Sequence, residues 1–162
     1  MTSSIALEDF LPYRISRVAE RTSRSLAQVY AARFAISVPQ WRVLATLAER
    51  PGLTASAVTG LTNLDKVKVS RAVAELQSRG LVLRQRSRAD RRAAELRLSA
   101  AGERLFARIA PLARDWERQL FKGFSSADRA QLFTLLARLE ERLSDTQGDE
   151  ELPPGAGAGV QP

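Results

Sequence analysis

The chain has 162 residues, of which 44% are hydrophobic and 27% charged, and this composition suits one globular domain with a substantial core. It contains no cysteine and no histidine, which excludes disulfides, thiolate or imidazole metal sites, and nucleophilic catalysis of the Ser/His/Asp or Cys/His type. The formal net charge is +7, and residues 65–92, with nine basic and three acidic side chains, carry +6 of it.

A basic segment this concentrated indicates a polyanionic partner, with nucleic acid as the first candidate and an anionic membrane surface as the second. For an isolated run of charge, a solvated face is the ordinary alternative. No apolar run approaches the roughly 20 residues of a membrane helix, and the start MTSSIALEDF lacks the basic-then-apolar layout of a secretory signal. We therefore expect a cytoplasmic protein without a membrane partner.

Helical periodicity and capping residues predict four helices in the first half of the chain. The expected ranges are 12–34, Ser37 or Val38 to Glu49, 55–61, and 66–79. Thr54 and Asp65 are typical N-cap residues for the third and fourth of these, and Gly80 is typical of the residue that follows a helix C-terminus. The last two helices would form a helix-turn-helix.

After Gly80 the pattern changes from helical to alternating, which predicts a β-hairpin. Its first strand has Leu81, Leu83 and Gln85 on one side, its tip covers 87–92, and its return strand covers 93–98. Two long helices should follow, from Ser99 to about 122 and, after Ser125, over 127–143. Beyond Asp145 the acidic, then Gly- and Pro-rich sequence is typical of disorder.

The helix expected over 66–79 has an apolar back and a basic front. On a helical wheel, Val69, Ala72, Val73 and Leu76 share one face, and the opposite face carries Val67, Lys68, Ser70, Arg71, Ala74, Glu75 and Ser78. Such a helix fits the DNA major groove, where Lys68 and Arg71 could reach guanine or phosphates, Ser70 a base or phosphate, and Val67 a thymine methyl. Alone, the pattern also describes an ordinary amphipathic surface helix.

The cationic hairpin tip shifts the balance toward DNA binding. Arg88, Arg91 and Arg92 repel one another, but they suit phosphates and a narrow minor groove, where negative potential is concentrated. Asp90 is expected to fix the conformation of Arg92 by accepting paired hydrogen bonds from its guanidinium. The alternative is that Asp90 forms an Asx-turn by itself. Helix, turn, helix and basic hairpin in this order predict a winged helix-turn-helix.

Four stretches together resemble the MarR family of bacterial transcription regulators. They are GLT at 52–54, LDKVKVSRAVAELQSRGLV at 64–82, DRR at 90–92, and LRLSAAGERL at 96–105. By position, Asp90 and Arg92 match the family's Asp-x-Arg wing signature with Arg91 between them. Lys66, Lys68, Ser70 and Arg71 fall in its recognition helix.

The resemblance implies an obligate homodimer whose two winged domains bind a pseudo-palindromic operator in double-stranded DNA. The dimer would be assembled by 12–34 and 100–143, segments that also carry apolar stripes too long for a small winged domain to bury alone. The residues expected at the interface are Phe106, Ile109, Leu112, Trp116, Leu120, Phe124, Leu132, Phe133, Leu135, Leu136, Leu139 and Leu143. The sequences DKVKVSRAV at 65–73 and VPQWRVL at 38–44 are most similar to the branch of the family that controls catabolism of aromatic or heteroaromatic acids.

Members of this family often sense small phenolic or carboxylated aromatic ligands in a cleft between the dimer helices and the winged domain. An aromatic wall with a guanidinium suits such a ligand, and the candidate residues are Tyr13, Arg14, Arg17, Trp41 and Arg42. The alternative is that Trp41 is a core residue and the arginines are solvated or in salt bridges. Without cysteine, the oxidation-sensing mode of the family is excluded.

The sequence therefore predicts a mainly α fold with a small β-hairpin wing, and neither a cofactor nor a metal. The expected domains are a dimerisation region (10–36 and 100–145), a winged helix-turn-helix domain (37–99) and a disordered tail (146–162). The expected function is a dimeric, sequence-specific DNA-binding regulator, most simply a repressor, that a small aromatic ligand releases from its operator. The alternatives are a nucleic-acid-binding module without sequence preference and, from a different class, a carboxylate-based enzyme, for which no paired acids stand out.

Overall fold

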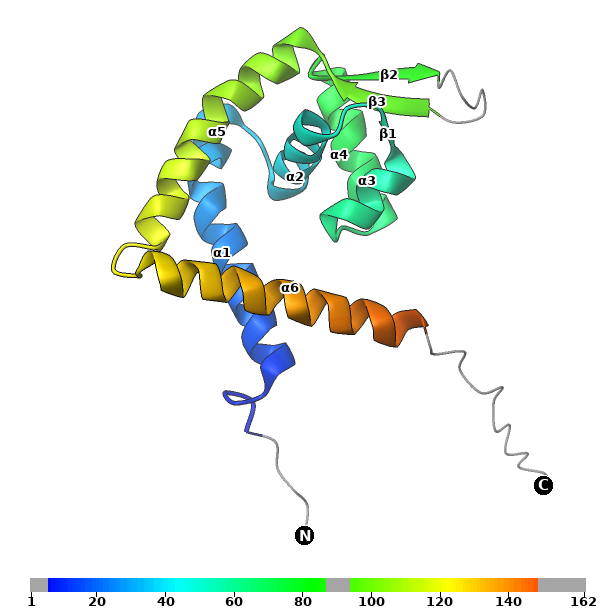
Figure 1. The fold of residues 1–162 in the computed structure, drawn as a ribbon. Coiled ribbons are helices and arrows are strands. Elements are labelled where there is room, and N and C mark those ends of the chain that lie inside the picture. The colour runs from blue at the N-terminus through cyan, green and yellow to red at the C-terminus, as the bar shows by residue number, and fades with distance from the viewer. Residues whose placement is uncertain (1–5, 87–93, 149–162) are drawn as a thin grey trace, which may run out of the picture. The chain divides into compact units, whose positions relative to one another are not determined.

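A computed structural model of the chain describes residues 6–86 and 94–148, and the chain divides into two compact units, residues 1–119 and 120–162. The first unit holds five helices and a small sheet in its described part (Figure 1). The helices are α1 (Leu11–Phe34), α2 (Val38–Glu49), α3 (Ala55–Thr62), α4 (Lys66–Ser78) and α5 (Ala100–Leu120). This mainly helical fold with a winged helix-turn-helix order is the predicted class. None of the described helices is long and apolar enough to cross a membrane.

The sheet is antiparallel, with strands β1 (Leu53–Thr54), β2 (Val82–Arg86) and β3 (Ala94–Leu98) in the order β1-β3-β2. Val82 lies opposite Leu98 and Arg84 opposite Leu96, which confirms the predicted hairpin. The sequence did not reveal β1, because two residues are too few for an alternating pattern. Leu81 lies just before β2 and is buried, while Leu83 is 41% exposed, so the two leucines predicted on one side of the strand differ in burial.

Polar caps explain where the helices of the first unit begin. Ser37 and Gln40 form a capping box, in which the Ser37 amide donates to Gln40 Oε1 (2.9 Å) and the Gln40 amide to Ser37 Oγ (3.4 Å). Thr54 Oγ1 accepts from the amide of Ala57 (3.1 Å) at the start of α3. These caps lie where the sequence predicts them, and each satisfies amides that have no partner within the helix.

The core lies where α2, α3 and α4 pack together beneath the sheet. Its most deeply buried side chains are Tyr30, Ile36, Val43, Leu44, Leu47, Val58, Val69, Leu76, Val82, Leu96 and Ile109. Full burial of each large aliphatic side chain stabilises the fold by roughly 1.5–3 kcal/mol. Ile109 is among the residues expected at a dimer interface, but it is fully buried within its own chain, so that expectation is wrong for this residue.

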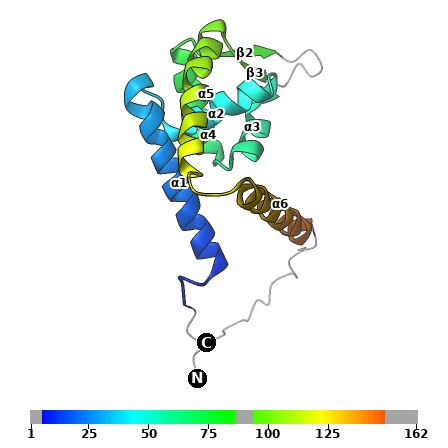
Figure 2. The same cartoon turned by 60° about the vertical axis from the view of Figure 1, so that its left-hand side comes forward.

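Two helices of the first unit, α1 and α5, lie side by side (Figure 2). Trp116 Nε1 on α5 donates to Ser25 Oγ on α1 (3.0 Å), and the guanidinium of Arg108 stacks 5.2 Å from the ring centre of Phe34. Other apolar side chains of α1 remain outside this contact. Leu11, Tyr13, Ile15 and Val18 are 42–59% exposed.

The second unit consists of α6 (Ser126–Gly148) and the segment before it. Ser125 caps α6, since its hydroxyl accepts from the Asp128 amide (3.1 Å) while the Asp128 carboxylate accepts from the Ser125 amide (2.9 Å). The helix continues three residues beyond Asp145, so disorder from 146 onward is the wrong expectation for 146–148. The rest of the predicted tail, 149–162, lies outside the described residues.

Candidate nucleic-acid interface and ligand pocket

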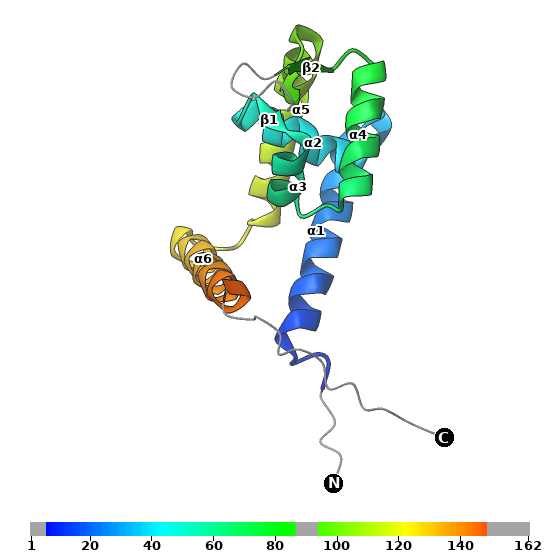
Figure 3. The same ribbon diagram turned by 90° about the vertical axis from the view of Figure 1, so that its right-hand side faces the viewer.

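Helix α4 lies at the edge of the first unit, with α2 and α3 on one side of it (Figure 3). Val69, Ala72, Val73 and Leu76 are buried, and the seven residues expected on the opposite face are all exposed. The predicted wheel is therefore confirmed. Val67 is 56% exposed although it is apolar, and it lies in the first turn together with Lys66 and Lys68. This first turn presents a small apolar surface beside positive charge.

Asp65 fixes the start of α4 and also holds one of the candidate cations. Its carboxylate accepts from the Lys68 amide (2.7 Å) and from the Lys68 ammonium (2.9 Å). The hydrogen bond from the Lys68 amide, followed by that from the Lys68 ammonium, lowers the pKa of the Asp65 carboxyl below its ordinary value. Arg71, one turn further along, has no ion-pair partner within the described part of the chain.

Two polar contacts fix α4 against the start of α2 and the end of α1. Gln40 Nε2 donates to Glu75 Oε2 (2.6 Å), and the Arg79 guanidinium donates to the carbonyls of Ala35 (2.7 Å) and Phe34 (3.1 Å). Sequence reasoning missed both contacts, because pairs 35 to 45 residues apart leave no local pattern. Glu75 is on the exposed face, as predicted, but it serves to hold the helix.

The base of the wing is closely packed against the start of α5. Ser99 Oγ accepts from the Gly102 amide (3.0 Å) and donates to the Gly80 carbonyl (2.6 Å). A Cβ atom at Gly102 would lie only 2.1 Å from the carbonyl oxygen of Leu81. The candidate wing residues Arg88, Asp90, Arg91 and Arg92 lie outside the described residues, so their DNA contacts and the Asp90–Arg92 pair stay predictions.

A pocket of about 350 Å³ lies between α2 and α5. Its lining consists of Trp41, Ala45, Ala48, Glu49, Phe106, Ala110, Ala113 and Arg114. The four alanines leave space for a flat group, while Arg114 and Glu49 supply one charge of each sign. A second pocket of about 460 Å³ adjoins it, shares Ala48 and Phe106 with it, and extends to Pro51, Arg97 and Glu103 at the base of the wing.

The structure does not bring the five predicted ligand residues together within one chain. Trp41 lines the pocket, but its ring is stacked between Tyr30 (5.3 Å) and Phe106 (5.8 Å). Tyr13 and Arg17 contact each other, with the guanidinium 5.8 Å from the ring centre. They lie near the start of α1, and Tyr13 is about 25 Å along the helix axis from Tyr30. Arg14 shares this exposed end of α1.

Arg42 is held by protein groups rather than facing the pocket. Its guanidinium donates to the Thr62 carbonyl (3.2 Å) and to Ser23 Oγ (3.0 Å). Nearby, burial raises the pKa of the Tyr30 hydroxyl, and the positive charge of Arg42 opposes that rise. Among the described residues no group of three or more His, Cys, Asp or Glu side chains could hold a metal ion.

Comparisons with known proteins agree with this geometry. A model of the MarR family matches residues 36–93. The transcriptional regulator HosA of Escherichia coli O157:H7 is 30% identical over 120 residues, covering 71% of this chain and 88% of HosA. The crystal structure of a MarR family transcriptional regulator from Silicibacter pomeroyi is 27% identical, with a TM-score of 0.73 over 90% of this chain and 95% of that one.

A further solved structure is similar in fold alone. It is that of BpsR from Bordetella bronchiseptica, a protein whose DNA binding is regulated by 6-hydroxynicotinic acid. The two chains are 21% identical, and the TM-score is 0.75 over 85% of this chain and 98% of BpsR.

Proposed function

This chain belongs to the MarR family and is a DNA-binding transcription regulator, and from this premise we propose that it forms a homodimer that represses transcription from a pseudo-palindromic operator. The observation that carries the proposal is the division of α4 into two faces. Four apolar side chains anchor the helix, and Lys66, Lys68, Ser70 and Arg71 are exposed on its other side. A helix held in this way can enter the major groove without disturbing the core.

The dimer is proposed from unburied apolar surface. Besides the four exposed side chains of α1, the described part of the second unit has Phe124, Leu132, Phe133, Leu135, Leu136 and Leu143 exposed at 39–62%. Contiguous exposed apolar surface marks interaction sites, and these ten side chains come from only two segments of the chain. We assign dimerisation to 10–36 and 100–145 and DNA binding to 37–99. In such a dimer the two α4 helices should be about 34 Å apart, one turn of DNA.

The effector is proposed to be a small aromatic or heteroaromatic carboxylate, bound in the 350 Å³ pocket between α2 and α5. The volume lies within the range of small-molecule sites, and Arg114 offers a guanidinium for the carboxylate. The fold likeness to BpsR, which responds to a heteroaromatic acid, favours this class of ligand. Tyr13, Arg14 and Arg17 could contribute only from the other copy of the chain, across the proposed dimer. Trp41 contributes a ring edge.

Selection of duplexes from a random library by the purified full-length protein tests the proposed operator binding. The proposal predicts a two-fold related consensus, bound roughly 10³-fold or more tightly than random duplex at the same salt concentration. Equal affinity for selected and random duplexes would instead support the alternative of a nucleic-acid module without sequence preference. A thermal-shift screen of aromatic acids tests the effector, because a ligand that binds only the folded protein raises its apparent stability.

A further inference from the structure

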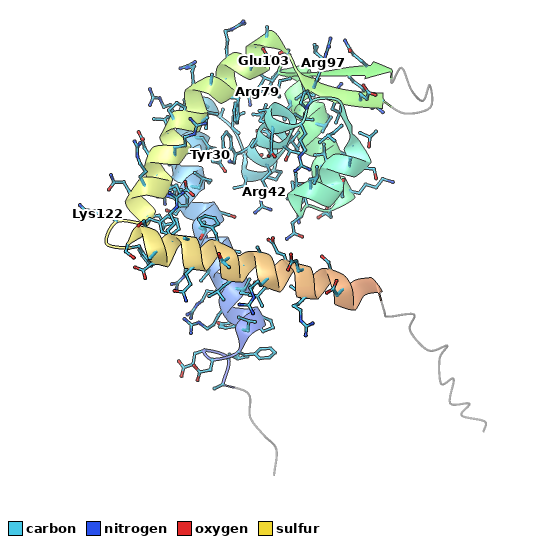
Figure 4. The ribbon with its side chains drawn as sticks, viewed as in Figure 1. Tyr30, Arg42, Arg79, Arg97, Glu103 and Lys122 are labelled. Carbon is cyan, nitrogen blue, oxygen red and sulfur yellow. The ribbon has the colours of Figure 1, made fainter. Side chains whose placement is uncertain are left out.

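Helix α4 and the turn before it are tied to α1 and α2 at three points. Glu75, in its second half, binds Gln40, and Arg79, at its end, binds the carbonyls at the end of α1. The third tie acts at the turn before α4, through Arg42 of α2. The positions of Arg42, Arg79 and Tyr30 are labelled in Figure 4. The first two ties act on the back half of the helix, and the third acts on the turn just before its first turn.

Arg42 joins two elements that are far apart in the sequence. One of its terminal nitrogens donates to Ser23 Oγ on α1, and the other donates to the carbonyl of Thr62, the last residue of α3. The side chain is half-buried, and Ser23 is half-buried as well. A planar guanidinium can donate in two directions at once, which a lysine ammonium at the end of its flexible stem does less well.

The Thr62 carbonyl is a sensitive point of attachment. The last carbonyls of a helix have no partner within it, so Arg42 satisfies a group that would otherwise lack a protein donor. Asn63 follows in the left-handed conformation (φ +52°), and Asp65 caps α4 two residues later. A shift of the Thr62 carbonyl therefore moves the N-cap and the exposed first turn of α4, where Lys66 and Val67 lie.

We propose that Arg42 is a positioning residue, which ties the turn before α4 to Ser23 on α1 and so sets the angle at which the first turn of α4 meets DNA. The inference rests on the proposed operator binding and adds to it a physical link between α1, the helix proposed for dimerisation, and the DNA-reading helix. Trp41, the residue before Arg42 in α2, lines the proposed effector pocket.

Amide hydrogen exchange on the full-length protein tests the tie without DNA or effector. Ser23→Ala removes the acceptor on α1, and we expect exchange at the amides of residues 63–69 to become about fivefold faster, the effect of one net hydrogen bond. Ser23→Thr keeps the hydroxyl and should exchange as the wild type does. Ser16→Ala, the same chemical change on the exposed part of α1, is the matched control for exchange and should leave the amides of residues 63–69 as they are in the wild type.

Ser23→Ala and Ser23→Thr are then measured against the duplex that the wild type selects. Ser23→Ala should lower the preference for that duplex over random DNA about fivefold, with the salt dependence unchanged, because every side chain that binds a phosphate is still present. Arg42→Lys should behave alike, and Ser23→Ala should add nothing in the Arg42→Lys background, since both changes break one link.

The outcomes separate this inference from the proposed function. If the wild type has no preferred duplex, the proposed function fails. If the wild type is selective but Ser23→Ala matches it in exchange at 63–69, or changes exchange without changing selectivity, Arg42 does not position α4. If the effects of Ser23→Ala and Arg42→Lys on duplex preference add in the double variant, the two residues do not act through one link and the inference is likewise overturned.

Discussion

Lys68 and Arg71 are successive cations on the exposed face of α4, and the structure holds them differently. The Lys68 ammonium is bound to Asp65, whereas Arg71 has no ion-pair partner in the described residues. A guanidinium without a partner can turn to a guanine edge without first breaking an ion pair. Base selection should therefore depend on Arg71 more than on Lys68.

We predict that Arg71→Ala weakens binding to the selected duplex by about 1–3 kcal/mol and relaxes the base preference at one position of each half-site. Fluorescence anisotropy against single-base variants of the duplex measures both effects. Arg50→Ala, a change of the same type at the end of α2, where the guanidinium is paired with Glu49, serves as the control. Unchanged affinity and preference in Arg71→Ala would show that this side chain does not read a base.

The wing arginines should act through phosphates. Arg91→Ala or Arg92→Ala is expected to weaken selected and random duplexes alike and to flatten the salt dependence by about one unit of slope for each phosphate that the variant no longer binds. Affinities at four or five salt concentrations give this slope. A weakening confined to the selected duplex, at an unchanged slope, would assign the wing to base reading instead.

Asp65 gives the stability of the fold a pH dependence. Because its pKa is lower in the folded chain than the ordinary value of 3.8, its charged form stabilises the fold at pH values above about 4, and this contribution is lost as the pH falls through the folded pKa. Asp65→Asn keeps an N-cap acceptor but removes the charge. Its Tm should be lower than that of the wild type at pH 7, and the difference should shrink as the pH falls below 3.8 and through the folded pKa. A difference that does not change with pH would contradict the assignment to the Asp65 charge.

At the scale of the element, the joint between the wing and α5 depends on a glycine. Gly102→Ala would place its Cβ on the Leu81 backbone, which cannot give way as a flexible side chain can. We expect a loss of about 1–3 kcal/mol in the free energy of unfolding, measured by denaturant titration. Gly60→Ala is the matched control, because Gly60 lies in α3 with open space around it, and it should gain about 0.5–1 kcal/mol. Similar effects of both changes would mean that the joint relaxes freely.

The elements themselves were largely predictable from the sequence, because their signals are local. Caps at Ser37, Thr54 and Asp65 and the stop at Gly80 place α2, α3 and α4 within one or two residues. The sheet edge β1 and the final turn of α6 were not predictable, since one is a two-residue strand and the other continues into polar sequence. The hydrogen bonds of Gln40, Arg42 and Arg79 join segments that are distant in the sequence, and local sequence patterns carry no information about such contacts.

The predicted ligand residues likewise succeed where residue type suffices and fail where contacts between distant segments decide. Trp41 was identified by residue type and does line a pocket, but the pocket's arginine is Arg114 rather than Arg42. If the effector carboxylate binds there, Arg114→Ala should abolish most of the thermal shift that the strongest acid from the screen produces, since a charge-assisted hydrogen bond is removed. Arg118→Ala, one turn along α5, is the control. A shift that survives Arg114→Ala would place the carboxylate elsewhere.

In the whole molecule, positive charge and unburied apolar surface have complementary proposed roles, which are DNA binding and dimerisation. The charge lies on α4 and the hairpin, and the apolar surface lies on α1 and α6, so that association of two chains would present two basic surfaces together. We propose that these two surfaces match the helical repeat of one duplex.

The spacing of the half-sites in the selected duplex tests that claim most directly. Inserting about five base pairs between the half-sites turns them to opposite sides of the DNA, and a rigid dimer can then reach only one of them. Affinity for this duplex should fall nearly to that for random DNA, and one duplex of the original spacing should bind two chains. Affinity that is indifferent to the insertion, with one chain bound per half-site, would contradict it.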